Sequence, residues 1–206
     1  LSLQNVNIVT RNSTCVGGLI GKCDVFAGDS IFILNCKLSG LVRYLSTTIA
    51  SIGGIIGACR AYEGSDIYIA NCQMCEKMGI IADARASIGG LAGVCEATET
   101  SNIYIKNCQM QSNIKGNYAT LGGIIGLGRN LTIHNSSAIS NLISKERAGG
   151  ITGTTEYGTV IKNCYAGGTI KGLDSENKVG GIAGYDTGGI IKYCYFNFTT
   201  NIIITP

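Results

Sequence analysis

The chain has 206 residues, of which 45% are hydrophobic and 14% are charged, so it can bury a core and wholesale disorder is excluded. Thirty glycines without a period of three, together with a single proline, exclude collagen and proline-rich linkers. The formal net charge of +3 comes from scattered residues, which argues against nucleic acid as a partner, and no apolar stretch is long enough to span a membrane.

A pentapeptide of the form GGxxG divides the chain into repeats. Its six copies begin at Gly17, Gly53, Gly89, Gly122, Gly149 and Gly180. A second landmark, Asn-Cys or a variant of it, begins at Asn35, Asn71, Asn107, Asn135, Asn163 and Tyr193. The two landmarks are 18 residues apart in the first three repeats and 13, 14 and 13 residues apart in the last three. The sequence therefore predicts one domain over 1–206, with long cysteine-rich repeats over about 15–120 and short repeats over about 121–206.

Each repeat has the pattern of strands rather than of a helix. The residues before the Asn alternate with period two, as in 66–71 and 102–107, and a further apolar run such as 79–82 closes the repeat. Three short strands separated by turns describe one coil of a solenoid, in which successive coils pair about 4.8 Å apart. We therefore predict an all-β fold, a right-handed parallel β-helix (β-solenoid) of about six coils with three short strands each.

The repeats resemble GLUG-motif repeats, in which a glycine, an aliphatic residue, a hydrophobic residue and a glycine recur in a β-rich array. The stretch 149–185 is the most similar, because it holds GGITG, the run NCYAGGTI and then GGIAG. The resemblance implies a secreted or surface protein of a microbe, such as a large adhesin or the non-catalytic repeat region of a peptidase that cuts immunoglobulin A. The first three repeats depart from the pattern by an insertion of about five residues and a second cysteine, so the family does not cover any function of that insertion.

Alignment of the repeats on the Asn predicts which side chains point inward. The positions four and two residues before it are aliphatic, and we expect them to stack as core columns. They are Ile31 and Ile33, Ile67 and Ile69, Ile103 and Ile105, and Leu131 and Ile133. The residues between them are expected to face outward, and they are Phe32, Tyr68, Tyr104 and Thr132. The Asn residues themselves are expected to form a stacked amide ladder, because no carboxylates accompany them as a calcium site would require.

Most of the ten cysteines follow the same alignment. One set follows the Asn position, at Cys36, Cys72, Cys108, Cys164 and Cys194, and the other occurs only in the long repeats, at Cys23, Cys59 and Cys95. Since the second set appears together with the insertion, the sequence predicts disulfides that close each inserted loop: Cys23 to Cys36, Cys59 to Cys72, and Cys95 to Cys108. The alternative is a column of buried free thiols. Zinc has only one half-site, Cys72-x-x-Cys75, and no metal or other cofactor is expected.

Four sequons permit N-glycosylation if the chain follows a eukaryotic secretory route, at Asn12, Asn130, Asn135 and Asn197. Asn12 and Asn197 fall in expected turns or edges and are the better candidates. Asn135 belongs to the amide ladder and is expected to be buried.

The sequence shows no catalytic constellation. Glycoside hydrolases need two facing carboxylates, whereas the acids here, such as Asp66 and Glu176, fall in turns of different coils. The one histidine, His134, is at an outward position, and no Ser or Cys has a spaced His partner. We therefore expect a non-enzymatic, extracellular or cell-surface structural or adhesin-like protein, whose outward tyrosines suit glycans or a host surface protein. The alternative is a carbohydrate-active β-helix enzyme, either a polysaccharide lyase or a hydrolase.

The two ends of the sequence suggest self-association. The chain begins at Leu1 without a methionine, and we interpret it as a processed or excised segment. Leu1 and Leu3 belong to a segment, 1–6, that aligns with 131–136, so the chain is expected to enter on the middle strand of an incomplete coil. The last apolar segment is expected to leave on a third strand that contains Ile202, Ile203 and Ile204. Neither end carries a capping helix or a charged edge, which predicts head-to-tail stacking into a filament, the alternative being a fragment whose flanks supply the caps.

Overall fold

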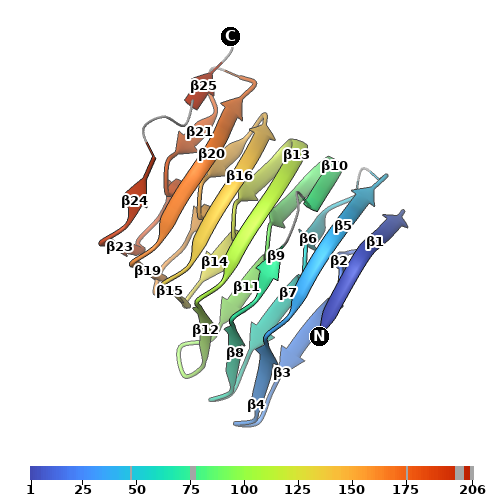
Figure 1. Cartoon of the computed structure of the whole chain (residues 1–206). Coiled ribbons are helices and arrows are strands. Elements are labelled where there is room, and N and C mark those ends of the chain that lie inside the picture. The colour runs from blue at the N-terminus through green and yellow to red at the C-terminus, as the bar shows by residue number, and fades with distance from the viewer. Residues whose placement is uncertain (47, 75–77, 175, 198–201, 205–206) are drawn as a thin grey trace.

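The computed structural model describes residues 1–46, 48–74, 78–174, 176–197 and 202–204, and these residues form strands and turns without a helix. Equivalent strands of successive coils run parallel and stack into three sheets, here called sheets A, B and C (Figure 1). Sheet A has 13 strands and sheets B and C have six each. The predicted parallel β-solenoid is therefore confirmed.

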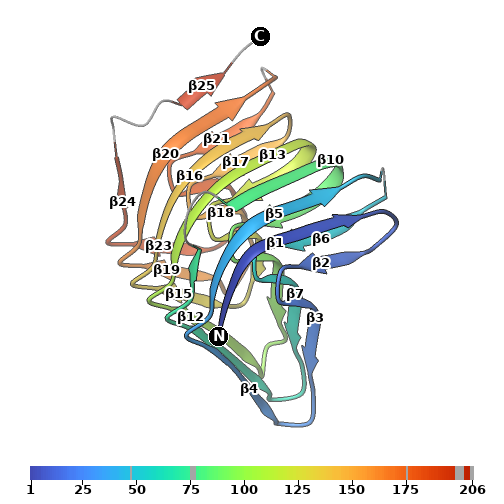
Figure 2. The ribbon, with the colours of Figure 1, turned by 45° about the vertical axis from the view of Figure 1, so that its right-hand side comes forward.

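The first coil shows the path of the chain. It consists of β2 (Cys15–Gly17), β3 (Ile20–Val25), β4 (Ser30–Leu34) and β5 (Lys37–Tyr44). β3 lies in sheet B and β4 in sheet C, whereas β2 and β5 both lie in sheet A. The chain therefore visits all three sheets once per turn and returns to its starting sheet one coil further along (Figure 2).

The remaining coils repeat this order, and β1 (Ser2–Thr10) precedes them. Coil 2 contains β6 (Ala50–Gly53), β7 (Ile56–Ala61), β8 (Asp66–Ala70) and β9 (Gln73–Met74). Coil 3 begins within β10 (Met78–Gly89) and continues with β11 (Ala92–Ala97) and β12 (Asn102–Lys106). Coil 4 begins within β13 (Gln109–Gly122) and contains β14 (Ile125–Arg129), β15 (Thr132–His134) and β16 (Ser137–Ser144). Coil 5 contains β17 (Arg147–Gly149), β18 (Thr152–Thr155), β19 (Val160–Lys162) and β20 (Tyr165–Gly172). Coil 6 contains β21 (Lys178–Gly180), β22 (Ala183–Asp186), β23 (Ile190–Lys192), β24 (Tyr195–Phe196) and β25 (Ile202–Ile204).

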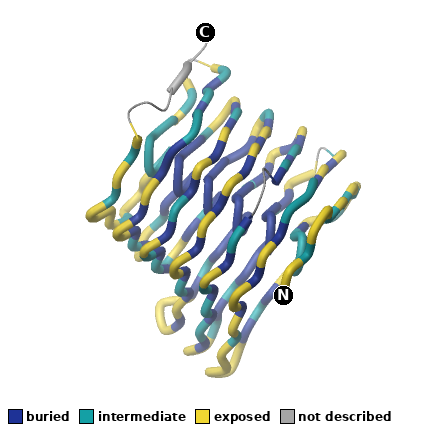
Figure 3. The backbone as a smooth tube through the Cα atoms, viewed as in Figure 1, coloured by how far each residue is buried: buried dark blue, intermediate teal, exposed yellow. Residues whose placement is uncertain are grey.

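The pairing register stacks the predicted aliphatic positions on one another. Ile67 pairs with Ile31 on one side and with Ile103 on the other, and all the predicted core residues from coil 2 to coil 4 are buried. Ile31 is only half-buried because β4 is the edge strand of sheet C. The core is a set of continuous columns that are well covered in the middle coils and less so at both ends (Figure 3).

The paired glycines of GGxxG allow a close approach that no other residue would permit. A Cβ on the first glycine, Gly89, would lie 2.0 Å from the carbonyl oxygen of Ala92 in the same turn. A Cβ on the second, Gly90, would lie 2.2 Å from the carbonyl oxygen of Gly123 in the next coil. Both positions therefore exclude a side chain, which explains why the pair recurs once per coil.

The first strand corrects one expectation from the sequence. Segment 1–6 does not enter on the middle strand, because β1 pairs with β5 in sheet A, with Ser2 opposite Lys37. Alternation of apolar and polar residues fits several registers, but a strand of 9 residues matches β5, with 8 residues, better than β15, with 3. At the other end, β25 pairs with β20 in sheet A, as expected for a third strand.

Candidate functional site

The insertion of the long repeats lies at the corner between sheets B and C. Glu96 of coil 3 lies opposite Arg129 of coil 4, and Tyr104 lies opposite Thr132. Residues 97–103 connect these two positions in coil 3, whereas only residues 130–131 connect them in coil 4. The corners of the long coils therefore extend further, and the outline of the solenoid steps inward between coils 3 and 4 (Figure 1).

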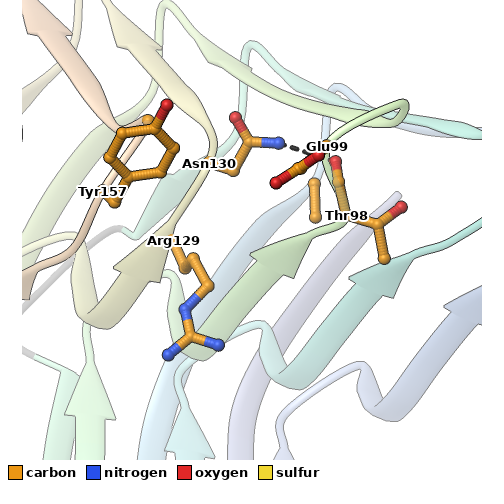
Figure 4. A pocket seen from close by; sticks show the side chains of 7 residues that line it. Thr98, Glu99, Arg129, Asn130 and Tyr157 are labelled. Carbon is orange, nitrogen blue, oxygen red and sulfur yellow. Dashed lines mark hydrogen bonds between the residues drawn. The ribbon is translucent and has the colours of Figure 1, made fainter.

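A cavity of about 650 Å³ lies at this step, and we call it the step cavity. Its lining comes from three successive coils and consists of Ala97, Thr98, Glu99, Arg129, Asn130, Tyr157 and Gly158 (Figure 4). The change in landmark spacing from 18 to 13 residues marks this place in the sequence. That change was the signal from which a hollow between coils 3 and 4 could have been predicted.

Asn130 holds the three corners of the step cavity together. Its Nδ2 donates a hydrogen bond of 2.6 Å to the carbonyl oxygen of Thr98, which belongs to coil 3 (Figure 4). Its backbone N–H donates to the carbonyl oxygen of Tyr157, in coil 5, at 3.0 Å. Asn130 adopts a φ of 49°, a left-handed conformation that Asn tolerates better than most residues. The wall of the cavity is therefore fixed by side-chain and backbone bonds together.

The charged side chains that line the step cavity are those of Glu99 and Arg129. Arg129 Nε donates to Glu156 Oε2 at 2.6 Å, and this hydrogen bond raises the pKa of the guanidinium. Glu99 is exposed at the cavity, and Tyr157 is 75% exposed. A polar ligand would thus meet one carboxylate, an ion-paired guanidinium and an aromatic ring. Glycoside hydrolysis uses two carboxyl groups, whereas the lining of this cavity contributes one.

The predicted outward aromatic residues form a stack on sheet C, here called the aromatic ladder, which consists of Phe32, Tyr68 and Tyr104. The ring centroids of Phe32 and Tyr68 are 5.0 Å apart and those of Tyr68 and Tyr104 are 5.1 Å apart, with interplanar angles of 8° and 17°. A second stacked pair, Phe26 and Tyr62, joins coils 1 and 2 at the corner. Since each ring packs on the next coil, the ladder contributes to contact between coils.

Asp66 lies beside the aromatic ladder, as the first residue of β8 rather than in a turn. Its carboxylate accepts a hydrogen bond from the hydroxyl of Tyr68 at 3.1 Å and another from Asn102 Nδ2 of the next coil at 3.0 Å. The bond to Asp66 raises the pKa of the Tyr68 hydroxyl. The ladder therefore has a hydrogen-bonded polar row along one side.

The predicted amide ladder is confirmed at two steps. All five Asn residues of the second landmark adopt left-handed φ values between 51° and 56°. Asn107 Nδ2 donates to Asn71 Oδ1, and Asn163 Nδ2 donates to Asn135 Oδ1, both at 3.3 Å. Asn135 is exposed, contrary to the expectation that it is buried, because the amide ladder lies on the outside of the corner. Asn163 Nδ2 also contacts Nε2 of His134, at 3.1 Å.

The sequons differ in their surroundings. Asn12 is exposed, and its Oδ1 accepts a hydrogen bond from Ser46. Asn197 is also exposed, and the rest of its sequon lies outside the described residues. The Nδ2 of Asn130, which would carry the glycan, is already bonded to Thr98. Glycosylation at any of the four positions stays a prediction.

The nine cysteines that the structure describes are free thiols, and Cys75 lies outside the described residues. The three predicted bridges are not formed, because the register brings each cysteine to its counterpart in the next coil. Cys59 is paired with Cys23 and with Cys95 in sheet B. Cys36, Cys72 and Cys108 each come directly after an Asn of the amide ladder. The Sγ of Cys108 lies 3.8 Å from the carbonyl oxygen of Ile69, which belongs to the preceding coil. The structure thus shows the alternative arrangement, columns of buried free thiols, and the equal spacing of 36 residues was the signal for it.

Comparisons of the chain with protein-family models, with curated proteins and with solved structures found no match. The resemblance to GLUG-motif repeats therefore stays a prediction. Within the described residues, the structure contains no helix long and apolar enough to cross a membrane. The same part of the chain contains no group of three or more His, Cys, Asp or Glu side chains that could hold a metal ion.

Proposed function

We propose that this chain is a non-enzymatic structural or adhesin-like protein of the extracellular space or cell surface, whose solenoid stacks head to tail. The observation that supports this proposal is the presence of partly buried apolar residues at both ends of the solenoid. The core is closed in the middle coils, whereas some of its apolar residues near the two ends are only partly buried. The partly buried apolar residues include Leu3, Leu19 and Ile31 near one end, and Val179, Ile182 and Phe196 near the other.

The strand edges at the two ends are complementary. Sheet B ends in β3 and β22, and sheet C ends in β4 and β23. A parallel edge strand presents backbone N–H and C=O groups that pair with a further parallel strand. Because the two ends belong to the same sheets, the last coil of one copy offers the edge that the first coil of another copy needs, a contact that repeats without closing.

If the strand register continues across such a contact, the aliphatic core residues of one copy lie against those of the next. The column through Ile33, Ile69, Ile105, Ile133 and Ile161 ends in Ile191. Ile191 is 41% exposed, whereas Ile161 is fully buried, so only the end of the column lacks cover. A second copy in register would place its Ile33 against Ile191 and would extend the column.

The test is sedimentation velocity over a concentration series, together with electron microscopy, of the wild-type chain and two variants. Ile191→Lys places a charge at the end of the stack. Ile139→Lys places the same charge on the side of coil 4, where the native isoleucine is 51% exposed. We expect concentration-dependent assemblies in the wild type and in Ile139→Lys, and monomers in Ile191→Lys. Monomers of the wild type at every concentration would overturn the stacking proposal.

A second candidate function, a carbohydrate-active enzyme, rests on the step cavity alone. Glu99 is the carboxylate of its lining, and Tyr157 offers a ring on which a sugar can pack. Turnover of a polysaccharide by the wild type, and its loss in Glu99→Gln, would favour the enzyme over the structural protein. Binding without turnover would instead support an adhesin-like role.

A further inference from the structure

Two buried cysteine thiols lie against each other between coils 2 and 3. The Sγ atoms of Cys59 and Cys95 are 2.7 Å apart. Both side chains are 0% exposed, and the two residues are direct partners in the parallel register of β7 and β11.

The backbone geometry at this pair suits a disulfide. Neighbouring strands of a sheet lie about 4.8 Å apart, which falls within the range of about 4.4 to 6.8 Å that disulfides span between Cα atoms. The adjacent residues, Arg60 and Glu96, form an ion pair of 2.9 Å across the same two strands and hold the same register. A bond of about 2.05 Å between the sulfurs therefore needs a shift of less than about 1 Å.

We propose that Cys59 and Cys95 form a disulfide that joins coils 2 and 3, and that it closes while the chain folds in the presence of a small disulfide oxidant such as oxidised glutathione. One protein thiolate attacks the oxidant, forms a mixed disulfide and releases one glutathione thiolate. The other protein thiolate then attacks the mixed disulfide, closes the protein bond and releases the second glutathione. Two protein thiols lose their protons and two electrons, and the oxidant becomes two molecules of glutathione.

Burial explains why the bond should form during folding rather than afterwards. In the folded chain, the hydrogen bond with Cys95 and burial raise the pKa of the Cys59 thiol well above its ordinary value. The thiolate is the attacking species, so Cys59 reacts slowly in the folded chain, and the burial of both thiols also excludes the oxidant. The same burial protects the bond once it has formed.

Cys23 is the competing partner, because it pairs with Cys59 on the other side. It is 8% exposed, and burial raises its pKa to about 11. The short sulfur contact of Cys59 is with Cys95, which selects Cys95 as the partner. Cys23 is therefore expected to remain a free thiol in the oxidised chain.

The test is peptide mapping after refolding with oxidised and reduced glutathione, alkylation of free thiols under denaturing conditions, and digestion with trypsin. Cleavage after Lys and Arg leaves Cys59 and Cys95 each as the single cysteine of its peptide, whereas peptide 23–37 holds both Cys23 and Cys36 and peptide 61–77 holds both Cys72 and Cys75. A bond from Cys59 to Cys95 joins peptides 44–60 and 86–106. A bond from Cys59 to Cys72 would instead join 44–60 to 61–77, and one from Cys59 to Cys23 would join 44–60 to 23–37. We expect the first product, and either of the others, or alkylation of both Cys59 and Cys95, would overturn the proposal.

A melting experiment gives a second readout. The register places Gly128 opposite Cys95, and Thr155 opposite Gly128, so this column tolerates other residues and Cys95→Thr should fold. We expect the wild type refolded with a reductant to melt about 5 to 10 °C below the wild type refolded with oxidised glutathione, and Cys95→Thr to melt at the same temperature after either treatment. Cys164→Ser, in coil 5, is the matched control and should keep the full effect of the reductant. An equal effect of the reductant on Cys95→Thr would contradict the proposed bond.

Discussion

The long coils 1 to 3 and the short coils 4 to 6 share one core but differ in how their surfaces are built. Ile69 of a long coil and Ile161 of a short coil belong to the same column, and both are fully buried. The long coils add the corner insertion, the aromatic ladder and the thiol column that contains Cys59. Core residues thus repeat through the whole solenoid, whereas the surface changes where the corner changes.

The aromatic ladder illustrates this difference. The position of Phe32, Tyr68 and Tyr104 is continued in the short coils by Thr132, Val160 and Ile190. In the long coils the strand of sheet C has five residues, whereas in the short coils it has three. The longer strands leave room for Asp66 and Asn102 beside the rings. The corner insertion and these surface contacts between coils therefore occur together in the long coils. Four predictions test this comparison.

The largest effect is expected from cavities in the shared core. Ile105→Ala in a long coil and Ile161→Ala in a short coil should each lower the free energy of unfolding by about 2 to 5 kcal/mol. Since the column is continuous, denaturation by guanidinium, followed by circular dichroism, should show a single transition in both variants. Ile139→Ala, at an exposed position of coil 4, is the control and should change stability by less than about 0.5 kcal/mol. Two separate unfolding transitions, with each variant shifting only one of them, would show that the long coils and the short coils unfold separately.

The next largest effect on stability is expected at alkaline pH, from the thiol of Cys164 in coil 5. Burial raises the pKa of Cys164 from 9.0 to about 11. Below pH 9 this thiol is protonated in both the folded and the unfolded chain, so it does not change stability. Between pH 9 and 11 the unfolded chain loses the proton first, so stability falls as pH rises, by at most about 2.7 kcal/mol. Thermal melts of the reduced chain should show a shallower fall in Cys164→Ser, in which serine matches Ser136 of coil 4; equal slopes would contradict this.

A smaller effect is expected from the aromatic ladder. Tyr68→Ala removes two stacked ring pairs, each of which contributes about 0.5 to 1.5 kcal/mol, so stability should fall by about 1 to 3 kcal/mol. Thr132→Ala removes the equivalent outward side chain of coil 4 and should cost less than about 0.5 kcal/mol. Urea denaturation of both variants measures the difference. A similar loss in the two variants would mean that the rings do not stabilise contact between the long coils.

The smallest effect is expected where the amide ladder ends. Tyr193 takes the place of the Asn in coil 6 and adopts a left-handed φ of 53°. Tyr193→Asn should relieve that strain and extend the ladder to Asn163, with a gain of about 1 kcal/mol in the free energy of unfolding. The same substitution combined with Asn163→Ala should lose the hydrogen-bond part of the gain. Calorimetry of the wild type, the two single variants and the double variant gives a double-mutant cycle. Additive effects would show that the two side chains do not interact.

Much of the fold could be predicted because the repeats are local and regular. Alternation before the Asn predicted the strand of sheet C, and the spacing of the repeats predicted that Ile67 lies over Ile103. The amide ladder through Asn71 was predicted from the recurrence of Asn, whereas its left-handed φ was not, and Tyr193 adopts the same φ in coil 6. Segment 1–6 was assigned wrongly from its alignment with 131–136, because its alternation fits more than one strand.

The candidate site was less predictable, because it depends on contacts between coils. The step cavity is lined by corners that lie up to 61 positions apart, from Ala97 to Gly158. A hypothesis that paired cysteines within one repeat was reasonable from spacing along the chain, yet it ignored the direction in which parallel strands stack. The register that placed Ile69 beside Ile105 applies equally to Cys59 and Cys95.

The sequence by itself determined the solenoid, its core columns and its Asn ladder, because each depends on a strict repeat of one residue type. Only the tertiary structure decided which cysteines meet, where β1 pairs and where the cavity opens. These features depend on distances between separate coils, and such distances are set by the stacking of whole strands rather than by any single repeat.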